Sequence, residues 1–351
     1  MGWPRSDLID LLGVRHPIIQ APMAGASTPA MAAAAANAGG LGSLGLALKK
    51  PESAAADMAA ARGLTNGALN VNFFCHQPPA DDPARFTAAR ERLAPYYAEF
   101  DLGDPPEEPS ASPPFNEAML EVVLAAAPSV ASFHFGLPPT DLVAPLKEAG
   151  IIILSSATSP DEARVLEAEG ADAIIAQGWE AGGHRGVFDP TKGPGDIGTF
   201  ALVPQVVDAV SVPVIAAGGI ADARGIAAAF MLGASGVQIG TAFLNSPESM
   251  VAEPHKKALL SDRTTGVTTA FSGRPARGVI NRYMQEMDGA ELPDFPLMNP
   301  MTAPLRSASQ KEGGGDFMSL WAGQAHSLNR EIGTGELLEN LAEEALSLLN
   351  G

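Results

Sequence analysis

The chain has 351 residues, of which 46% are hydrophobic and 18% are charged, which indicates a folded protein with a substantial core and excludes general disorder. Its formal net charge of -18 argues against a nucleic-acid partner, because binding to phosphates requires clustered Lys and Arg. Its one cysteine, Cys75, excludes an intrachain disulfide, fits a reducing cytoplasm and leaves too few thiolates for a zinc or iron–sulfur site.

The N-terminal region predicts neither secretion nor membrane insertion. The opening "MGWPRSDLIDLLGV" lacks the uninterrupted apolar core of a signal peptide. The Ala-rich stretch "TPAMAAAAANAGG" is too short and too weakly apolar to span a bilayer. We therefore expect a cytoplasmic protein with no membrane partner.

Buried strands and Ala-rich helices alternate along most of the chain. Eight apolar runs bounded by Gly and Pro are predicted to be strands: 16–23, 40–47, 68–74, 129–136, 151–158, 171–178, 212–220 and 236–244. Between them, Ser159 and Asp222 are typical first residues of helices that Gly170 and Gly233 end. Alternating elements predict a parallel sheet covered by helices, and eight units close an α/β (β/α)8 TIM barrel. A doubly wound open sheet is the alternative.

The pattern at Gly40, Gly42 and Gly45 matches G-x-G-x-x-G but not the context of a dinucleotide site. That motif requires a strand before it and a helix after it, whereas these glycines follow a helix and lie in the second predicted strand. Close packing of small residues, with a helix C-cap at Gly39, is the preferred interpretation.

Two regions interrupt the alternation. Residues 75–116 are rich in Pro and acidic residues and predict an insertion after the third strand, with a short helix near 86–99. Residues 262–316 contain Gly, Pro and irregular stretches. Two closing helices are expected after them, near 317–329 and 335–349.

These regions suggest how the chain is organised. The insertion and the later excursion would form a smaller lobe over the barrel mouth. The expected divisions are a barrel with its insertion at 1–261, an excursion or lid at 262–316, and closing helices packed on the barrel at 317–351.

Polar residues and glycines gather at the ends of the predicted strands, where a barrel builds its active site. The residues that would face the mouth are Pro22, Met23, Asn70, Asn72, Gln177, Gly218, Gly219, Gln238, Ile239, Gly240 and Thr241. The glycine-rich ends of the seventh and eighth strands expose backbone N–H groups, which favours a phosphorylated cofactor or substrate. The side-chain amides can donate and accept, which suits the edge of a flavin ring, and loop capping is their alternative role.

The segment "QGWEAGGHRG", residues 177–186, places a histidine on a glycine-containing turn after the sixth strand. Gly182 and Gly183 would let the backbone run close to a flat cofactor, because no Cβ intervenes. His184 would then lie over the cofactor as a group that exchanges protons near neutral pH. A structural role is the alternative, but loops at barrel mouths are where catalytic groups concentrate.

Other histidines and arginines are weaker candidates. His134 lies near a strand end and is predicted to contact the substrate, with a core histidine bonded to backbone as the alternative. No two histidines have the spacing of metal ligands, so no metal is expected. Arg274 and Arg277 are interpreted as internal salt-bridge partners in preference to anion-attracting groups at the mouth.

Several segments together match a known family. "APMAG", "AAAAANAGGLGSLG", "NVNFF", "SFHFGLP", "AQGWEAGGHRG", "AAGGIADARGIAAAFMLGASGVQIGTAF" and "FSGRPARG" occur in this order from about residue 14 to 285, and "LWAGQ" follows at 320–324. The chain therefore resembles the class I nitronate monooxygenases, formerly called 2-nitropropane dioxygenases.

The resemblance implies an FMN-dependent barrel that oxidises alkyl nitronates, propionate 3-nitronate among them, with O2 to a carbonyl compound and nitrite. It implies that His184 is the catalytic acid or base, which would remove the α-proton if neutral nitroalkanes are also accepted. The implied FMN contacts are Pro22, Met23, Asn72, Gln177, Gly182, Gly219 and residues 238–241. The partners would be a small-molecule nitronate and O2, and a homo-oligomer stays open.

In one respect the chain departs from the family pattern. Some members line the pocket with tyrosines and a lysine, whereas the comparable stretches here are "PSASPPFNE" and "DFPLMNPMTAPLR", with Phe115, Phe295 and Asn299 and no tyrosine. Two other functions stay open. One is a related flavin barrel that takes hydride from NAD(P)H to reduce an enoyl thioester or a quinone, and the other is a binding barrel with no redox role.

Overall fold

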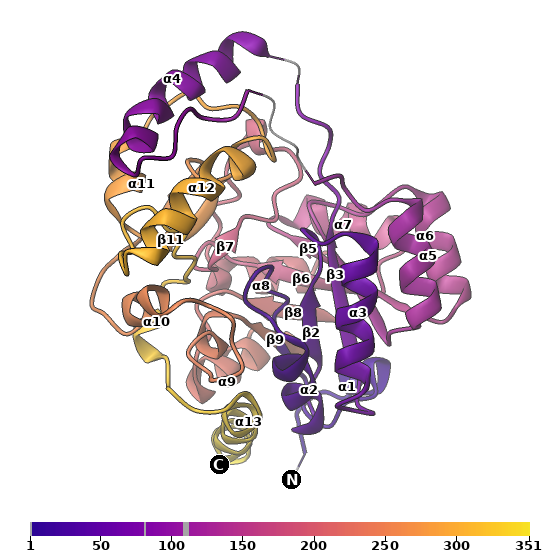
Figure 1. Cartoon of the computed structure of the whole chain (residues 1–351). Coiled ribbons are helices and arrows are strands. Elements are labelled where there is room, and N and C mark those ends of the chain that lie inside the picture. The colour runs from indigo at the N-terminus through magenta and orange to yellow at the C-terminus, as the bar shows by residue number, and fades with distance from the viewer. Residues whose placement is uncertain (1, 81, 108–111) are drawn as a thin grey trace.

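The computed structural model describes residues 2–80, 82–107 and 112–351, and its centre is an eight-stranded parallel sheet (Figure 1). The sheet has the order β1-β9-β8-β6-β5-β4-β3-β2. Its strands are β1 (Ile18–Gln20), β2 (Gly42–Gly45), β3 (Leu69–Phe74), β4 (Val130–His134), β5 (Ile152–Ala157), β6 (Ala173–Gln177), β8 (Val214–Ala217) and β9 (Gly236–Ile239). Each lies within one of the predicted strands, and those predictions are confirmed.

The two ends of this order meet and close the sheet. Strand β1 pairs with β9 in parallel, and Ile19 forms a parallel bridge to Leu41 immediately before β2. The Gln20 N–H donates to the Leu41 carbonyl at 3.0 Å. The prediction of a (β/α)8 barrel is confirmed, and the open doubly wound sheet is excluded.

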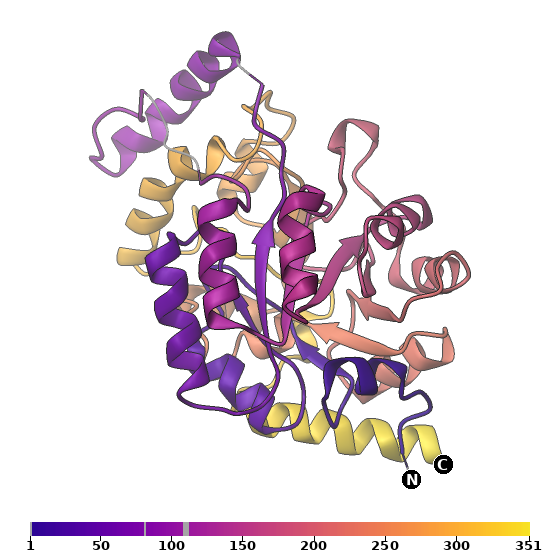
Figure 2. The ribbon, with the colours of Figure 1, turned by 90° about the vertical axis from the view of Figure 1, so that its right-hand side faces the viewer.

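Helices cover the outside of the barrel, as Figure 2 shows for α3, α5 and α6. The outer helices are α2 (Pro29–Asn37), α3 (Pro51–Arg62), α5 (Glu117–Ala126), α6 (Thr140–Glu148), α7 (Pro160–Ala168), α8 (Thr199–Val207), α9 (Ala223–Met231) and α13 (Thr334–Asn350). Helix α13 packs its leucines into the core beside α2 and α9. The closing helix expected near 335–349 is therefore confirmed.

The helix boundaries follow the predicted capping residues. The Ser159 side chain accepts a hydrogen bond from the Glu162 N–H at the start of α7, and Asp222 accepts from two N–H groups at the start of α9. After the same helices, Gly170 and Gly233 have φ angles of 101° and 98°, in the left-handed region that favours glycine.

The lower half of the barrel interior is filled by apolar side chains. Leu154, Ile175 and Ile215 of the strands pack there with Leu8 and Leu12 of α1 (Asp7–Leu12). Because this layer is solid, only the end of the barrel formed by the C-terminal ends of the strands is left for a binding site.

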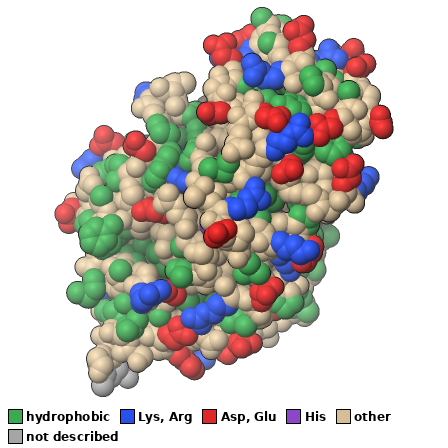
Figure 3. Space-filling model, turned by 90° about the vertical axis from the view of Figure 1, so that its left-hand side faces the viewer, with side chains coloured by type: hydrophobic (Ala, Val, Ile, Leu, Met, Phe, Trp, Pro, Cys, Tyr) green, Lys and Arg blue, Asp and Glu red, His purple; other side chains and the backbone are tan. Residues whose placement is uncertain are grey.

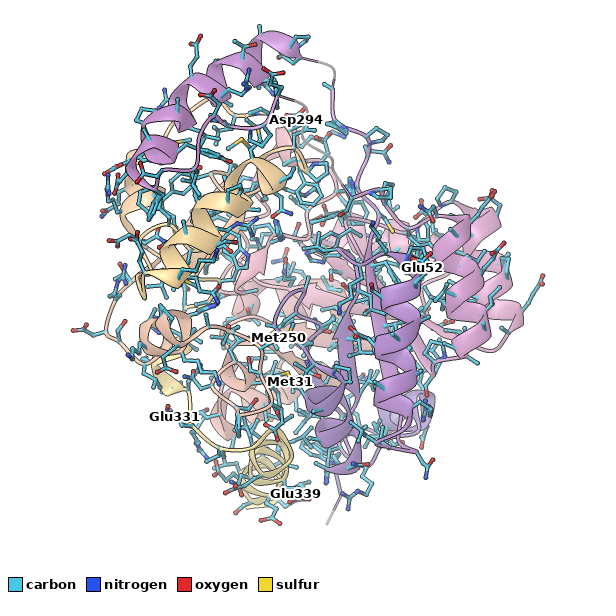
Figure 4. All side chains as sticks on the ribbon, in the orientation of Figure 1. Met31, Glu52, Met250, Asp294, Glu331 and Glu339 are labelled. Carbon is cyan, nitrogen blue, oxygen red and sulfur yellow. The ribbon has the colours of Figure 1, made fainter. Side chains whose placement is uncertain are left out.

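A smaller lobe stands beside the barrel mouth (Figure 1). It contains α4 (Pro83–Glu99), β7 (Gly183–His184), α10 (Glu253–Leu259), β10 (Thr265–Thr268), β11 (Ala276–Val279), α11 (Arg282–Glu286) and α12 (Met298–Lys311). Helix α4 confirms the helix predicted in the insertion and begins three residues earlier. Its Tyr97 hydroxyl donates to the Met301 carbonyl of α12 at 2.6 Å, and Arg85 pairs with Asp294, which lies below the start of α4 in Figure 4.

The predicted helix near 317–329 is wrong. Only a short 3-10 helix, His326–Leu328, occurs in this stretch. Residues 320–324 are extended instead, because their backbone pairs with other segments: the Val279 N–H donates to the Leu320 carbonyl, and the Gln324 N–H donates to the Glu180 carbonyl. The sequence analysis also missed α12, which lies in the region that it described as irregular.

Some expectations are not tested. Residues 81 and 108–111 of the predicted insertion lie outside the described residues, and the division at 261 and 316 stays a prediction.

Within the described ranges, no helix is long and apolar enough to cross a membrane. On the side of the lobe seen in Figure 3, acidic and basic side chains are interspersed with apolar ones.

Candidate active site

A cavity of about 430 Å³ opens at the C-terminal ends of the barrel strands. Its volume lies in the usual range for small-molecule and cofactor sites. The strand ends line one side and the lobe lines the other, through Phe295, Asn299, Arg306 and Trp321. Apolar Met250, labelled in Figure 4 and 56% exposed, lies at its outer rim.

A second hollow, of about 590 Å³, lies at α9 and α13 and opens widely to solvent. Four of its five charged side chains pair with one another, Arg224 with Asp222 at 2.5 Å and Arg330 with Glu344 at 2.9 Å. Because these charges are already satisfied, the barrel-mouth cavity is the better candidate despite its smaller volume.

Most of the predicted site residues line the barrel-mouth cavity. They are Pro22, Met23, Asn72, His134, Gln177, Gly182, Gly183, His184, Gly218, Gly219, Gln238, Gly240 and Thr241. Asn70 and Ile239 do not line it. Asn70 is fully buried deeper in the barrel and donates to Ser43 Oγ at 3.0 Å, and the Ile239 side chain points into the core between sheet and helices.

His184 is held in a short strand rather than on a free turn. In β7, Gly183 and His184 pair antiparallel with Arg277 and Ala276 of β11. A Cβ on Gly182 would lie 2.5 Å from the Gly323 nitrogen, and Gly183 has a φ angle of 71°. The close approach at Gly182 is thus made by the protein's own backbone, whereas a Cβ on Gly183 would meet no atom within 4 Å, so the approach of a cofactor to Gly183 stays a prediction.

Two side chains fix the backbone of His184. Its carbonyl accepts hydrogen bonds from Gln177 Nε2 at 3.0 Å and from His134 Nε2 at 3.1 Å. Since a carbonyl only accepts, His134 carries its proton on Nε2, and its Nδ1 accepts from Ser156 Oγ at 3.0 Å. The Gln177 oxygen accepts from the Gly186 N–H at 2.7 Å. His134 and Gln177 therefore position the His184 segment.

The imidazole of His184 lies in an apolar, aromatic environment. Its Nε2 is 2.9 Å from Ser272 Oγ. Ring centroids 5.5 to 6.1 Å from its own belong to Phe74, Phe135, Phe295 and Trp321. Burial lowers the pKa of His184 to about 3, and nearby positive charge acts in the same direction. The ring is therefore neutral at neutral pH and able to accept a proton.

The opposite part of the cavity offers unpaired backbone donors. Gly218 and Gly219 have φ angles of 108° and 71°, which favour glycine. No backbone hydrogen bond between described residues uses the N–H of Gly219 or Gly240. In addition, the buried Oε1 of Gln238 has no partner within the described part of the chain. Free donors beside an unpaired acceptor fit a phosphorylated ring compound.

Arg274 and Arg277 have an internal role, but not as salt-bridge partners. Arg274 donates to the carbonyls of Val187 and Phe188, and its guanidinium lies 3.9 Å from the centre of the Phe135 ring. Arg277 donates to the Trp179 carbonyl at 3.0 Å. No ion pair among the described residues includes either arginine, so the expected carboxylate partners are replaced by carbonyls and aromatic faces.

Sequence reasoning missed several residues of the site. Ser272 lies in the quoted segment "FSGRPARG" without having been singled out, and Arg306 lies in α12, which was not predicted. Of the three residues noted as departing from the family, Phe295 and Asn299 line the cavity, whereas Phe115 packs against Phe73 and Phe133 in the core. The alternation of residues along a strand indicates which side chains point into the barrel. No comparable pattern in the sequence indicates which side chains of the lobe reach the cavity.

Comparison with known proteins identifies the family. A model of the family described as nitronate monooxygenase matches residues 5–344. A protein of Pseudomonas aeruginosa named nitronate monooxygenase is 48% identical over 95% of this chain and 97% of its own length. One of that name from Paraburkholderia phytofirmans is 44% identical over 96% of this chain and 94% of its own.

Solved structures agree with this result. The nitroalkane oxidase of Streptomyces ansochromogenes has a TM-score of 0.90 and 40% identity, and covers 97% of this chain and 98% of its own. FabK of Thermotoga maritima is less similar, with a TM-score of 0.74, 32% identity and coverage of 98% of this chain and 96% of its own. With a barrel, a partly buried imidazole at its mouth and a family match over nearly the whole length, the chain belongs to the nitronate monooxygenase family.

Proposed function

We propose that the protein oxidises nitronates with O2 to a carbonyl compound and nitrite, with FMN held at the barrel mouth. Family membership, the names of its relatives and its similarity to a nitroalkane oxidase support this proposal. The observation that carries it is a neutral imidazole in an aromatic-lined cavity whose opposite part has a glycine edge with unpaired donors.

The residues present fit FMN. The backbone N–H groups of Gly219 and Gly240 would hold the phosphate, since they are free to donate. Pro22, Met23 and Asn72 would bound the ring system, and Gln238 would contribute its unpaired amide. When bound, FMN supplies the electron transfer from the substrate to O2.

The protein's own groups position the substrate and move its proton. The aromatic rings around His184 exclude water from the reacting carbon. The Ser272 hydroxyl is 3.3 Å from the Arg274 carbonyl, to which it donates, so its oxygen accepts from the Nε2–H of His184. Nδ1 of His184 is then the basic atom that takes the α-proton of a neutral nitroalkane. A nitronate has already lost that proton and does not require this step.

Substitution of Gln238 by Met tests the cofactor assignment. Because the buried Oε1 of Gln238 has no protein partner, Gln238→Met should leave the flavin-free protein equally stable or about 1 kcal/mol more stable. The same change should weaken FMN binding by about 10-fold to 100-fold. The measurements are urea denaturation of the flavin-free protein and a flavin-fluorescence titration.

Gln177→Met is the matched control for this prediction. Both ends of the Gln177 amide are bonded within the protein, so its loss should destabilise the flavin-free protein by about 1–3 kcal/mol. Tight FMN binding by a destabilised Gln238→Met variant would contradict the assignment.

The proposed activity is tested by adding propionate 3-nitronate to the FMN-loaded protein in air. Nitrite release coupled to O2 uptake is the expected result. Mixing the protein with NADH without air tests the alternative, because rapid bleaching of the flavin would favour a reductase of an enoyl thioester or a quinone. A colourless protein that takes up no FMN would support a binding barrel instead.

A further inference from the structure

Phe135 is held in a backbone conformation that bulky residues rarely adopt. It follows β4 and has a φ angle of 73°, in the left-handed region that is costly for any side chain other than glycine. Ser155 Oγ, on the neighbouring strand β5, lies 3.2 Å from the Phe133 carbonyl and 3.0 Å from the Gly136 carbonyl, which precede and follow this residue. Because strain of this kind persists where the surroundings enforce it, often at functional sites, the side chain of Phe135 calls for a role.

The ring of Phe135 contacts groups of the active site without lining the cavity. Its centroid lies 6.1 Å from that of His184, with the two rings nearly perpendicular, and 5.5 Å from that of Phe295. The guanidinium carbon of Arg274 lies over the same ring, 3.9 Å from its centre. Phe135 is only 5% exposed and is not among the residues that line the cavity. Its ring therefore acts on the site through its neighbours rather than by touching the substrate.

Arg274 depends on this ring for the contact of its guanidinium face. The side chain is buried, and its Nη2 donates to two backbone carbonyls of the loop after β7. Its Nε has no partner within the described part of the chain. The carboxylates whose charges act on it belong to Glu162 and Asp189, but no ion pair between described residues joins either of them to Arg274. Since a desolvated cation is attracted strongly to an aromatic face, Phe135 fixes the place of this charge.

Arg274 is also a neighbour of the proposed base. Ser272 Oγ lies 2.9 Å from His184 Nε2 and 3.3 Å from the Arg274 carbonyl. The groups whose charges act on His184 are His134, Arg274 and Arg306. His134 is itself neutral at neutral pH, because burial lowers its pKa to about 4, and Arg274 acts more strongly than Arg306. A positive charge near an imidazole disfavours its protonated form.

We propose that Phe135 is a positioning residue whose ring holds the guanidinium of Arg274 beside His184, so that this fixed positive charge keeps the base unprotonated in acid. The inference rests on the proposed function, in which His184 is the base. It also accounts for the backbone of Phe135, because the left-handed conformation places one ring where it contacts Arg274 and His184 together.

A matched pair of variants at position 135 tests the proposal. Phe135→Leu and Phe135→Tyr both keep a side chain at the left-handed position, but only Tyr keeps an aromatic face for the cation. The quantity compared is the acid midpoint, the pH at which kcat/KM for nitroethane has fallen by half. Phe135→Leu should raise the acid midpoint by about 1 pH unit, whereas Phe135→Tyr should leave it unchanged. Phe135→Met also lacks the aromatic face and replaces Phe135→Leu if the latter does not fold.

The assay must reach low pH before the protein unfolds. The FMN-loaded protein is therefore held at neutral pH and mixed rapidly with acidic substrate solution, down to about pH 3.5, because the wild-type base stays neutral well below the value of a free histidine. Tryptophan fluorescence reports whether the protein is still folded during the measurement. Flavin content and thermal midpoint are measured for each variant.

A second substitution separates the charge of Arg274 from burial of the imidazole. Arg274→Met removes the charge and should raise the acid midpoint at least as far as Phe135→Leu does. In the double variant, the midpoint should equal that of Arg274→Met alone, because the ring acts only through the charge. A further rise in the double variant would mean that the ring acts by excluding water from His184, and the inference would be overturned.

NMR of the full-length protein with isotope-labelled histidines reads the protonation of His184 directly, and the spectrum of His184→Asn assigns its signal. The same order of midpoints is expected, and no turnover is needed. An unchanged midpoint of His184 in Phe135→Leu would overturn the positioning role while the activity stands. If the wild type releases nitrite from neither nitroethane nor its nitronate, the proposed function has failed, and the NMR midpoints still decide the role of Phe135.

Discussion

Replacement of His184 by Asn is expected to lower the oxidation of neutral nitroalkanes by about 10²- to 10⁴-fold, the usual contribution of a general base. Oxidation of the corresponding nitronates should fall far less, because their α-proton has already been removed. Initial rates of nitrite release, measured with 3-nitropropionate and with its pre-formed nitronate, give the comparison. Equal losses for the two forms would count against the role of His184 as a base.

The pH profile provides a second measurement of the same role. Burial holds the pKa of His184 at about 3, well below the value of about 6.5 for a free histidine. The unprotonated base therefore persists down to about pH 4, and kcat/KM for a neutral nitroalkane should stay level between pH 8 and pH 5. A decline with a midpoint near 6.5 would mean that the imidazole is solvated in the working enzyme.

Ser272→Ala is the control for orientation. It removes the hydroxyl that is 2.9 Å from Nε2 of His184 but keeps the imidazole itself. We expect nitroalkane turnover by this variant to fall about 10-fold. This corresponds to about 1.4 kcal/mol, the usual contribution of one hydrogen bond. A loss as large as that of His184→Asn would make Ser272 part of the proton transfer rather than a positioning residue.

The barrel was predictable because its signals are local. Each strand is an apolar run of a few residues, and residues such as Ser159 and Asp222 begin helices through bonds to the next turn of the same chain. The ends of parallel strands meet at one edge, so Asn72, Gln177 and Gln238 could be assigned to one mouth without coordinates.

The lobe was not predictable in the same way, because distant contacts decide its structure. Helix α12 contains Pro304 in its interior, and a proline at such a position predicts a break. Packing of its Met301 and Leu305 beside Tyr97 of α4 overrides that local preference. The same reason hid Arg306, whose place at the cavity depends on how α12 packs.

The position of a residue along a strand explains the two predicted site residues that lie outside the cavity. Successive side chains of a strand point to opposite faces, so Gln238 faces the barrel interior and Ile239 faces the helices. Asn70 and Asn72 face inward together, but Asn70 lies two residues further from the mouth. The strand pattern specifies the face of a side chain more directly than its depth.

Acid is expected to destabilise the folded protein well above the pKa of its carboxylates. Burial lowers the pKa of five histidines: that of His16 below its ordinary value, that of His184 to about 3, and those of His76, His134 and His255 to about 4. Unfolded, each would titrate near 6.5. Their contribution to stability is therefore fully present above pH 6.5 and is lost as the pH falls towards 4, because only the unfolded chain binds these protons.

The size of this pH effect on the free energy of unfolding distinguishes buried histidines from exposed ones. Each group contributes at most about 1.4 kcal/mol per pH unit, so the free energy of unfolding should fall steeply between pH 6.5 and pH 5. Urea denaturation of the flavin-free protein at several pH values measures the slope. His76 lies outside the cavity. In the His76→Asn variant, the slope of the free energy of unfolding against pH should decrease by up to about 1.4 kcal/mol per pH unit, the contribution of one proton. A stability that is level from pH 6.5 to pH 5 would mean that these imidazoles, His184 included, are protonated equally in both states, and the neutral base at the barrel mouth would then lose its physical foundation.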